Sequence, residues 1–323
     1  MHPNSYGCPP LFLAPMEGVG DRAFRKAMAT IGGFDQACTE FIRVPCNAHV
    51  KSLAKVYEHN LTTPILQAAQ LMGDDPELMA AMAVEIELRQ APRIDLNCGC
   101  PSNTVTGKGA GSSLLKNPEH LYKVARAMVK AVSIPVTAKL RSGFHDTSLF
   151  KENLLAAQES GIKFLTLHPR TKEDGYRAPA KWELIAKAKS LLKIPVVGNG
   201  DILSVKCALD MLKMTSCDAL MIGRGAVINP LIFHEIKCYF AKSDMTASFD
   251  LIENFIGTFV TNFSEDLTER GRMNKLKQLF GFLFQKNKSL QEQRQVMLTN
   301  VYLSANDILQ RNLPILQKLF QTN

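Results

Sequence analysis

The chain has 323 residues, of which 46% are hydrophobic, so it can bury one large core and a smaller second core. Its longest apolar stretches are too short to span a bilayer, and its first residues lack the basic and apolar regions of a signal peptide. We therefore expect a cytoplasmic protein with no part in a membrane. The net charge of +8 permits a polyanionic partner without requiring one.

Eight short β-rich runs recur along roughly the first 240 residues, and each is followed by a helical segment. Their ends lie roughly 24 to 42 residues apart, which is the length of a strand plus a crossover helix. The expected strands are 11–14, 36–39, 64–70, 93–97, 135–140, 163–168, 194–198 and 217–222. A repeat of this size favours an α/β fold of the TIM (β/α)8 barrel type over an open doubly wound sheet.

Three helix starts between these strands are marked by capping residues. Asp75 and Asn117 each precede a proline, and Ser204 precedes a helical run. A short polar side chain before the first turn satisfies free backbone amides, and proline fits the first helical position. These positions therefore predict helices that begin at 76, 118 and 205.

The last part of the chain has helical periodicity and few strand signals. We expect a barrel domain over residues 1–243 and a smaller helical domain over residues 248–323. An apolar stripe is predicted along one helix of the second domain, at Leu276, Leu279, Phe280 and Leu283. Near it the basic residues are Arg270, Arg272, Lys275, Lys277, Lys286, Lys288 and Arg294, against one acid, Glu292. This excess of basic residues is typical of a solvated helix face, and it would also suit binding to the phosphate backbone of a nucleic acid.

The run at 93–97 leads directly into Cys98 and Cys100, which are separated by one glycine and followed by Pro101. Structural zinc sites need two to four residues between paired thiols and redox dithiols need two, so this spacing predicts neither a metal site nor a redox pair. A thiol at the end of a strand is well placed for chemistry. We expect only one of these two thiols to serve the site.

Polar residues gather at the ends of the predicted strands, where the active site of a TIM barrel lies. They are Pro15-Met16-Glu17-Gly18, Glu40, Gln70, Asn97 with Cys100, Lys139 with Arg141, His168 with Arg170, Asn199-Gly200-Asp201 and Gly223-Arg224-Gly225. Any single one can be incidental, since a lone histidine in an apolar strand is more often structural than catalytic. Their joint position at one end of the strands favours an active site.

The segments 199–201 and 223–225 follow the last two strands and match the usual phosphate site of such barrels. They predict a phosphorylated cofactor or substrate, although tight glycine turns beside a surface arginine would give the same pattern. Lys139, in the middle of the barrel, suits a ligand with negative charge on a ring, as in a reduced flavin. A Schiff-base lysine is the competing interpretation.

Seven motifs together resemble the tRNA-dihydrouridine synthases, and the resemblance covers nearly the whole chain. The motifs are Ala14–Val19, Thr39–Phe41, Asp95–Ser102, Lys139–Arg141, His168–Thr171, Asn199–Asp201 and Met221–Gly225. Within that family the segments 40–44, 97–100 and 170–178 look most like the bacterial C branch, which modifies uridine 16 in the D loop of tRNA.

The resemblance implies an FMN-dependent barrel in which NADPH reduces the flavin. Hydride then passes from flavin N5 to C6 of a flipped-out uracil, and Cys100 gives a proton to C5 as the general acid. An ordinary thiol pKa of about 8.5 keeps Cys100 protonated at neutral pH, and Cys98 is expected to be a packing residue. The implied cofactor-binding residues are Pro15, Met16, Glu17, Gln70, Lys139, His168, Asn199, Gly200, Asp201, Gly223 and Arg224.

The resemblance also implies that the C-terminal helical domain binds tRNA. Nothing in the sequence requires more than a monomer or a stable protein partner, so we expect a monomer. The expected contacts to tRNA are Arg43, Asn97, Arg141, Tyr176, Lys275, Lys277 and Gln278. Asn97 and Arg141 are expected to recognise the edges of the uracil ring. Tyr176 is expected to stack on the base or contact the ribose, and a loop tyrosine that covers apolar surface is an equal alternative.

Two other classes of protein remain open from the residues. A flavin barrel that acts on a free pyrimidine, in the manner of dihydroorotate dehydrogenase, explains the flavin site and the cysteine but not the basic helical tail. A non-catalytic RNA-binding barrel explains the tail but leaves Lys139, His168 and Arg224 without a purpose. The tRNA-dihydrouridine synthase interpretation explains all of these features.

Overall fold

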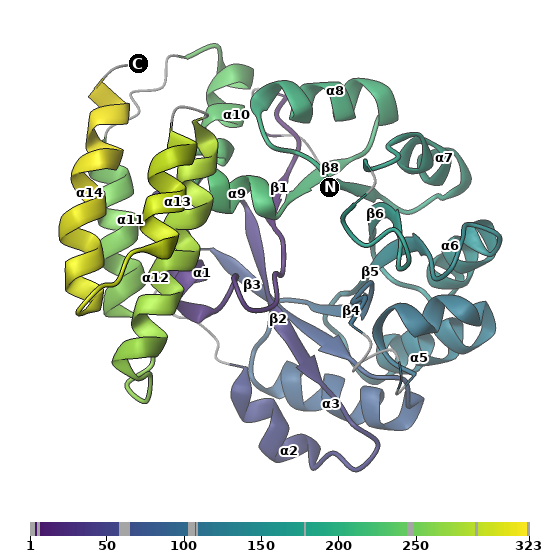
Figure 1. Ribbon diagram of the computed structural model, residues 1–323. Coiled ribbons are helices and arrows are strands. Elements are labelled where there is room, and N and C mark those ends of the chain that lie inside the picture. Colours follow the sequence, from purple (N-terminus) through teal and green to yellow (C-terminus); the bar gives the residue numbers. More distant parts are fainter. Residues whose placement is uncertain are drawn as a thin grey trace.

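A closed barrel of parallel strands, paired in the order β1 to β8, forms the body of the protein (Figure 1). The computed structural model describes residues 4, 7–57, 65–102, 107, 109–177, 179–243, 249–287 and 290–321. The strands are β1 Leu11–Leu13, β2 Gln36–Arg43, β3 Leu66–Met72, β4 Ile94–Cys98, β5 Val136–Gly143, β6 Leu165–Thr171, β7 Val196–Asn199 and β8 Ala219–Ile222. The TIM-barrel prediction is confirmed.

The helices alternate with the strands and surround them. They are α1 Arg22–Ile31, α2 Val50–Leu53, η1 Ala54–Val56, α3 Pro76–Leu88, η2 Gly111–Lys116, α5 Pro118–Ala131, α6 Phe150–Glu159, α7 Glu183–Leu191, α8 Val205–Thr215, α9 Arg224–Ile228 and α10 Ile232–Ala241. Within the described residues, no helix combines the length and the apolar character that crossing a bilayer requires.

Three strands run three or more residues further than the β-rich patterns predict. β2, β5 and β6 continue to Arg43, Gly143 and Thr171, so several residues expected just after a strand lie within one. Each extension follows a shift in register, after which the paired strands keep hydrogen bonding beyond the barrel rim. Polar residues interrupt the β-rich pattern there, and the pairing with a neighbouring strand compensates for their low strand propensity.

The predicted helix caps are confirmed. The Asp75 side chain accepts hydrogen bonds of 2.9 Å from the amides of Glu77 and Leu78 at the start of α3. The Asn117 and Ser204 side chains cap α5 and α8 in the same way. These bonds satisfy amides that the first turn of a helix leaves free. The helices that follow β3, β4 and β7 therefore begin at fixed residues.

The barrel interior combines an apolar plug with a polar chain. Phe12 and Phe164 stack with ring centroids 5.8 Å apart, near one end of the interior. The guanidinium of Arg93 lies 4.8 Å above the Phe164 ring and forms an ion pair with Asp95, which is 1% exposed. Outside the strands, a larger apolar cluster joins the strands to the surrounding helices. The barrel interior therefore contains both packed aromatic rings and buried charged side chains.

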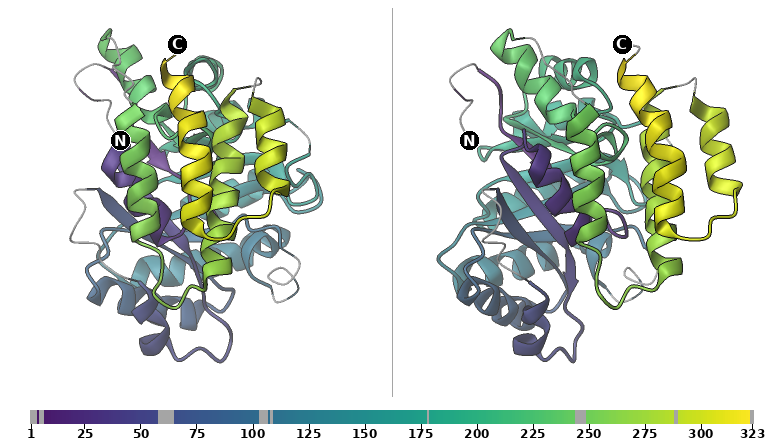
Figure 2. Two further views of the ribbon diagram at one scale, coloured as in Figure 1. Left: turned by 60° about the vertical axis from the view of Figure 1, so that its left-hand side comes forward. Right: turned by 90° about the vertical axis from the view of Figure 1, so that its left-hand side faces the viewer.

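The C-terminal part is helical, as predicted, and packs against the first helix of the barrel (Figure 2). Its helices are α11 Phe249–Thr261, α12 Glu269–Leu283, η3 Phe284–Lys286, α13 Gln291–Thr299 and α14 Ala305–Gln321. Phe255 of α11 meets Phe24 of α1 edge to face, with ring centroids 5.9 Å apart. The predicted apolar stripe of α12 is buried. Lys288 and the side chain of Lys286 lie outside the described residues.

Candidate active site

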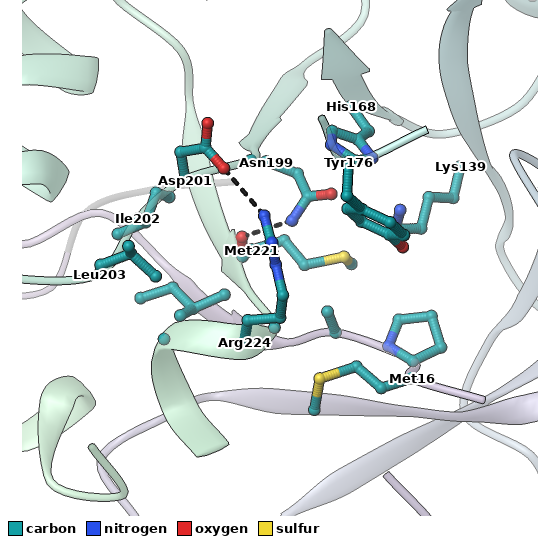
Figure 3. A pocket seen from close by; sticks show the side chains of 16 residues that line it. Met16, Lys139, His168, Tyr176, Asn199, Asp201, Ile202, Leu203, Met221 and Arg224 are labelled. Carbon is teal, nitrogen blue, oxygen red and sulfur yellow. Dashed lines mark hydrogen bonds and ion pairs between the residues drawn. The ribbon is translucent and has the colours of Figure 1, made fainter. Parts of the chain in front are cut away.

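A pocket opens at the carboxyl ends of the strands and collects most of the predicted cofactor residues (Figure 3). Its lining consists of Ala14, Pro15, Met16, Lys139, His168, Tyr176, Asn199, Gly200, Asp201, Ile202, Leu203, Met221, Ile222, Gly223, Arg224 and Gly225. These residues come from segments far apart in the sequence. They meet because the carboxyl ends of parallel strands lie at the same end of a barrel.

Asp201 organises the side of the pocket beside β7 and β8. Its carboxylate accepts hydrogen bonds from Arg170 at 2.6 Å, from Arg224 at 2.9 Å and from the backbone amide of Ala180 at 2.9 Å. Burial acts to raise the pKa of Asp201, but these hydrogen bonds and cations hold it below its ordinary value. Asp201 is therefore ionised and keeps two guanidinium groups at the pocket.

The turn that carries Asp201 has a backbone available to few residues. Gly200 has φ of +112° and Asp201 has φ of +56°. A Cβ on residue 200 would lie 3.1 Å from the His168 ring, so both the backbone and the space favour glycine. The Asn199 side-chain amide donates a 2.8 Å hydrogen bond to the Met221 carbonyl and joins the ends of β7 and β8. The pocket floor is therefore rigid at this point.

Lys139 extends from β5 toward the pocket with no hydrogen-bonding partner in the part of the chain that the structure describes. Burial and the nearby Arg141 lower the pKa of Lys139 to about 8. On the adjacent strand β6, the buried Thr166 hydroxyl also lacks a partner. Thr166 is fully buried and does not line the pocket, so of these two groups Lys139 is the one suited to a bound ligand.

His168 lies beside Lys139 and is held from behind by an arginine. Nη1 of Arg170 lies 3.1 Å from Nε2 of His168, and both side chains are buried. Burial lowers the pKa of His168 far below its ordinary value, and the nearby cations, first Lys139, lower it further. His168 is therefore neutral at physiological pH.

Tyr176 covers one side of the pocket from the loop after β6. Its ring lies 5.8 Å from the His168 ring, 5.2 Å from the Arg141 guanidinium and 4.8 Å from that of Arg224. Tyr176 is nevertheless 56% exposed. An exposed aromatic ring held by two guanidinium groups is suited to stacking on a planar ligand.

Cys100 lies where β4 has ended, and a turn separates it from Cys98. In a continuing strand, residues two apart would share a face, so alternation does not separate the two thiols. The Asn97 side-chain oxygen accepts 2.9 Å hydrogen bonds from the amides of Gly99 and Cys100 and turns the chain. Cys98, the last residue of β4, is buried in the large apolar cluster that joins strands and helices, whereas Cys100 is half-buried against Met72.

The Cys100 thiol is suited to proton donation. Burial raises the pKa of Cys100 above its ordinary value, and Glu17 raises it further, while Arg141 and Arg43 act in the opposite direction. A higher pKa favours the protonated thiol at neutral pH. Cys100 does not line the pocket, but its thiol interacts electrostatically with Lys139, which does.

Gln70 is fully buried and does not line the pocket. Its Nε2 donates to Asp95 at 2.8 Å, and its Oε1 accepts from Asn97 at 2.8 Å. Asp95 also accepts a 2.6 Å hydrogen bond from Thr137. In this structure Gln70 therefore supports Asn97, and through it the turn of Cys100.

Arg141 holds backbone at the pocket rim. Its Nε donates to the Gly99 carbonyl at 2.9 Å, and its Nη1 donates to the carbonyls of Thr171 and Gly175 at 2.7 and 2.9 Å. The guanidinium thus joins the cysteine turn to the loop that carries Tyr176. Arg141 and Asn97, both expected to contact the base, have these internal bonds in the structure.

Glu17 and Arg43 lie beside the pocket rather than in its lining. Glu17 is exposed and lines a neighbouring cleft together with Glu40. The Glu40 carboxylate accepts a 3.0 Å hydrogen bond from the amide of Gly18, which holds the loop after β1. Arg43 ends β2, and its charge lowers the pKa of the Cys100 thiol.

The two lysines of α12 that we expected at tRNA phosphates have partners within the protein. Lys275 pairs with Asp21, the N-cap of α1. Lys277 donates to the carbonyls of Asn300 and Leu298 at 2.8 and 3.3 Å, just after and at the end of α13. Both lysines therefore hold the C-terminal helices in place.

Two other basic residues of this stretch also bond backbone. Arg272 donates to the Leu267 carbonyl at 3.2 Å, and Arg294 donates to the Gly281 carbonyl at 2.7 Å. Gln278, by contrast, is exposed on α12. Arg272 and Arg294 are therefore not simply cations on a solvated helix face, because each of them bonds a backbone carbonyl within the protein.

The sequence-based prediction missed the roles of Arg170 and Asp95. Arg170 is named among the strand ends but not among the site residues, although it contacts both His168 and Asp201. Asp95 has a signal in the sequence, since Arg93, Asp95 and Asn97 alternate with apolar residues along β4. Alternation places these three polar side chains on the inner face of the barrel.

Fold and site together define a TIM-barrel protein whose pocket, at the carboxyl ends of the strands, is lined by cations and has a thiol beside it. The family model for dihydrouridine synthase matches residues 12–313. The chain belongs to the dihydrouridine synthase family. This confirms the predicted family and the class of enzyme.

Curated relatives agree with this assignment. A tRNA-dihydrouridine(16) synthase of Neisseria meningitidis serogroup B is 39% identical over 71% of this chain and 71% of its own length. The protein of the same name from Ralstonia nicotianae is 34% identical over 84% of this chain and 86% of its own length. A third, from Escherichia coli O157:H7, is 38% identical over 70% of this chain and 75% of its own length.

Solved structures support the fold. The chain resembles a 2-naphthoyl-CoA reductase complex with a TM-score of 0.54 and 10% identity, over 73% of this chain and 50% of that one. It resembles a histamine dehydrogenase from Rhizobium sp. 4-9 with a TM-score of 0.52 and 14% identity, over 77% and 48%. The chain spans about half the length of these two proteins.

Proposed function

We propose that this enzyme reduces a uridine of tRNA, at position 16 of the D loop, to 5,6-dihydrouridine, with FMN as its bound cofactor and NADPH as the reductant. The observation that carries the proposal is the combination, at one barrel end, of the cationic pocket and the protonated Cys100 thiol. The position on tRNA is supported by the relatives that are tRNA-dihydrouridine(16) synthases.

The residues present fit FMN. Lys139 lines the pocket and has no hydrogen-bonding partner among the described residues, and a polar planar ring would pair with it. Arg224 and the turn at Gly223 would hold the phosphate, since anions bind where backbone amides and a cation converge. Pro15 and Met16 would contact the ring, and Asn199 and Asp201 would hold the ribityl chain.

The protein residues divide the reaction between them. When bound, FMN supplies the hydride that enters C6 of the uracil ring. Cys100 gives its thiol proton to C5, the C5=C6 bond becomes single, and the thiolate regains a proton from water. Arg141 and Tyr176 hold the base beside the pocket. Arg141 is charged, as its hydrogen bonds to backbone carbonyls require.

The proposal assigns the catalytic barrel to residues 1–243 and the tRNA-binding region to residues 248–323, with Arg43, Lys275, Lys277 and Gln278 as contacts to the RNA. Lys275 and Lys277 would have to exchange or share their present partners when phosphate approaches. In this proposal the enzyme works in the cytoplasm as a monomer. The excess positive charge of the chain favours such an encounter.

The test is reduction of unmodified tRNA by the purified protein with FMN and NADPH. We expect flavin absorption in the purified protein and one dihydrouridine per tRNA, at position 16, mapped by mass spectrometry of nuclease fragments. Reduction of free uracil or orotate but not of tRNA would contradict the proposal. A colourless protein that binds tRNA without reducing it would also contradict it.

A further inference from the structure

The His168 imidazole lies between the pocket and a buried guanidinium. Nη1 of Arg170 is 3.1 Å from Nε2 of His168. An arginine has only donors and stays charged in proteins, so Arg170 donates and Nε2 accepts. A neutral imidazole with an accepting Nε2 must carry its proton on Nδ1.

The Nδ1 atom of His168 has no partner in the part of the chain that the structure describes, and the residue lines the pocket. Arg170 itself does not line the pocket and lies behind the imidazole. The two nitrogens of the ring therefore face different surroundings. Nε2 is paired with protein, and Nδ1 is available to a ligand.

The charges around His168 keep it neutral. Lys139, Arg141, Arg170 and Arg224 all act to lower the pKa of His168, in addition to its burial. The carboxylate of Asp201, which lines the pocket, is already bonded to Arg170 and Arg224. A second proton on the ring would add a charge to four cations, which is unfavourable in a buried site.

Arg170 is held firmly enough to fix the ring. Its Nη2 donates to Asp201 at 2.6 Å, and only 4% of its side chain is exposed. Asp201 is in turn held by the Ala180 amide and by its position in a left-handed turn. The carboxylate orients the guanidinium, and the guanidinium orients the imidazole.

We propose that Arg170 is a positioning residue that locks His168 as the neutral, Nδ1-protonated tautomer, so that His168 presents one fixed N–H donor to an acceptor atom of the ligand in the pocket. The identity of this ligand as FMN rests on the proposed function, whereas the tautomer does not. A locked neutral histidine cannot act as the acid of the reaction. Proton donation is therefore left to Cys100.

The tautomer can be measured directly in the cofactor-free protein labelled with 15N-histidine. Long-range 1H–15N correlation spectra distinguish the two neutral tautomers and the charged ring, and His168→Asn identifies the signal of His168. We expect a neutral, Nδ1-protonated ring from pH 5 to pH 8. An Nε2-protonated ring, or a ring that becomes charged in this range, would overturn the proposal.

Arg170→Met tests the cause. We expect its His168 signal to move toward the Nε2-protonated form, and Arg170→Lys, which can still donate, to restore the wild-type tautomer in part. Arg126→Met is the matched control, because Arg126 donates to the carbonyl of Ser160, the C-cap of α6, and lies outside the pocket lining. A wild-type tautomer in folded Arg170→Met would overturn the proposal, and the spectrum of the wild-type protein tests it even when this variant does not fold.

Titration with FMN separates this inference from the proposed function. We expect Arg170→Met to bind FMN about tenfold more weakly than the wild type, through loss of one oriented hydrogen bond. Equal affinity in the two proteins would overturn the role toward the ligand. A wild-type protein that does not bind FMN would overturn the proposed function, while an Nδ1-protonated signal would still support the lock.

Discussion

The Gln70 amide donates a 2.8 Å hydrogen bond to the Asp95 carboxylate, and this contact sets the direction of the bonds that lead to Cys100. An ionised carboxylate can only accept, so Nε2 of Gln70 must face Asp95 and its Oε1 must face Asn97. Asn97 then turns its own oxygen to the amide of Cys100. A buried charge thus fixes the orientation of two amides and of the turn that carries the thiol.

Gln70→Glu would replace the amide that donates to Asp95 with a second carboxylate. Its folded-state pKa would be raised above its unfolded value, because two carboxylates 2.8 Å apart cannot both ionise. Stability is then lost as pH rises through that raised pKa, and we expect a loss of about 3 kcal/mol at pH 8. Thermal unfolding at pH 5 and pH 8 measures the difference.

The matched control is Gln67→Glu on the same strand. Gln67 accepts a 3.0 Å hydrogen bond from Arg25, so a carboxylate at this position meets a cation. Its folded-state pKa is lowered, and its contribution to stability is present above the unfolded pKa and lost as pH falls. Equal pH dependence in Gln67→Glu and Gln70→Glu would contradict the proposed chain of bonds.

Cys100→Ala should separate flavin reduction from tRNA reduction. The variant lacks the proton donor but keeps Lys139 and the Arg224 side of the pocket, so FMN binding and reduction by NADPH should remain near the wild-type rate. Turnover on tRNA should fall by 100-fold or more, in the range of about 10² to 10⁴ that general acids supply. Stopped-flow flavin absorbance and dihydrouridine mapping measure the two steps.

Cys98→Ala is the control for that experiment. Cys98 ends β4 and is buried in the large apolar cluster, so its loss should cost about 1 kcal/mol of stability and leave turnover intact. Loss of FMN binding in Cys100→Ala would assign a structural role to Cys100. Equal loss of turnover in both variants would contradict the distinction between the two thiols.

The affinity for FMN should depend on the charge of Lys139. Burial and Arg141 lower the pKa of Lys139 to about 8, so its ammonium loses its proton through pH 8 instead of near 10.5. Above pH 7 the FMN phosphate is already dianionic, since its second pKa is about 6. We therefore expect FMN affinity to fall between pH 7 and pH 9 in a fluorescence titration. Lys139→Met should bind more weakly and lose this slope, and a slope that persists would assign the titration to another group.

Lys277→Ala should weaken tRNA binding and reduce its salt dependence. Removal of one phosphate contact lowers the slope of log K against log salt by about 1. Because Lys277 also bonds the carbonyls after α13, we expect a stability loss of about 1 kcal/mol in the same variant. Filter binding at several salt concentrations and thermal unfolding measure the two effects, with flavin reduction unchanged.

The neighbouring residue Gln278 provides the matched control, because it is exposed and uncharged. Gln278→Ala should weaken tRNA binding slightly without changing the salt slope. A salt slope equal to that of the wild type in Lys277→Ala would contradict the assignment of Lys277 to a phosphate and leave it a purely structural role.

The order of the strands and the gathering of residues at their ends could be predicted from the sequence. A βα repeat of regular length admits few topologies, and a parallel barrel brings Lys139, His168 and Asp201 to one end whatever the details of packing. Strand ends were less predictable. The extension of β2 to Arg43 depends on its pairing with Met72, which local propensity does not contain.

The hydrogen-bonding partners of the charged side chains could not be predicted from the sequence. Spacing places Lys275 and Lys277 on one helix, but the orientation of α12 against α1 and α13 decides that one meets Asp21 and the other meets carbonyl oxygens. The position of Arg170 two residues after His168 predicts a shared face and gives no indication of which nitrogen it contacts. These features depend on tertiary packing.

The contact between Phe24 and Phe255 has a consequence for the choice of nucleotide. It fixes the C-terminal helices to the first helix of the barrel, and the pairing of Lys275 with Asp21 adds a second attachment beside it. The span from these helices to Cys100 is then a constant of the molecule. If the helices hold the RNA as proposed, the nucleotide that reaches the thiol is selected by its distance from the RNA segment that these helices bind, and not by its neighbouring bases.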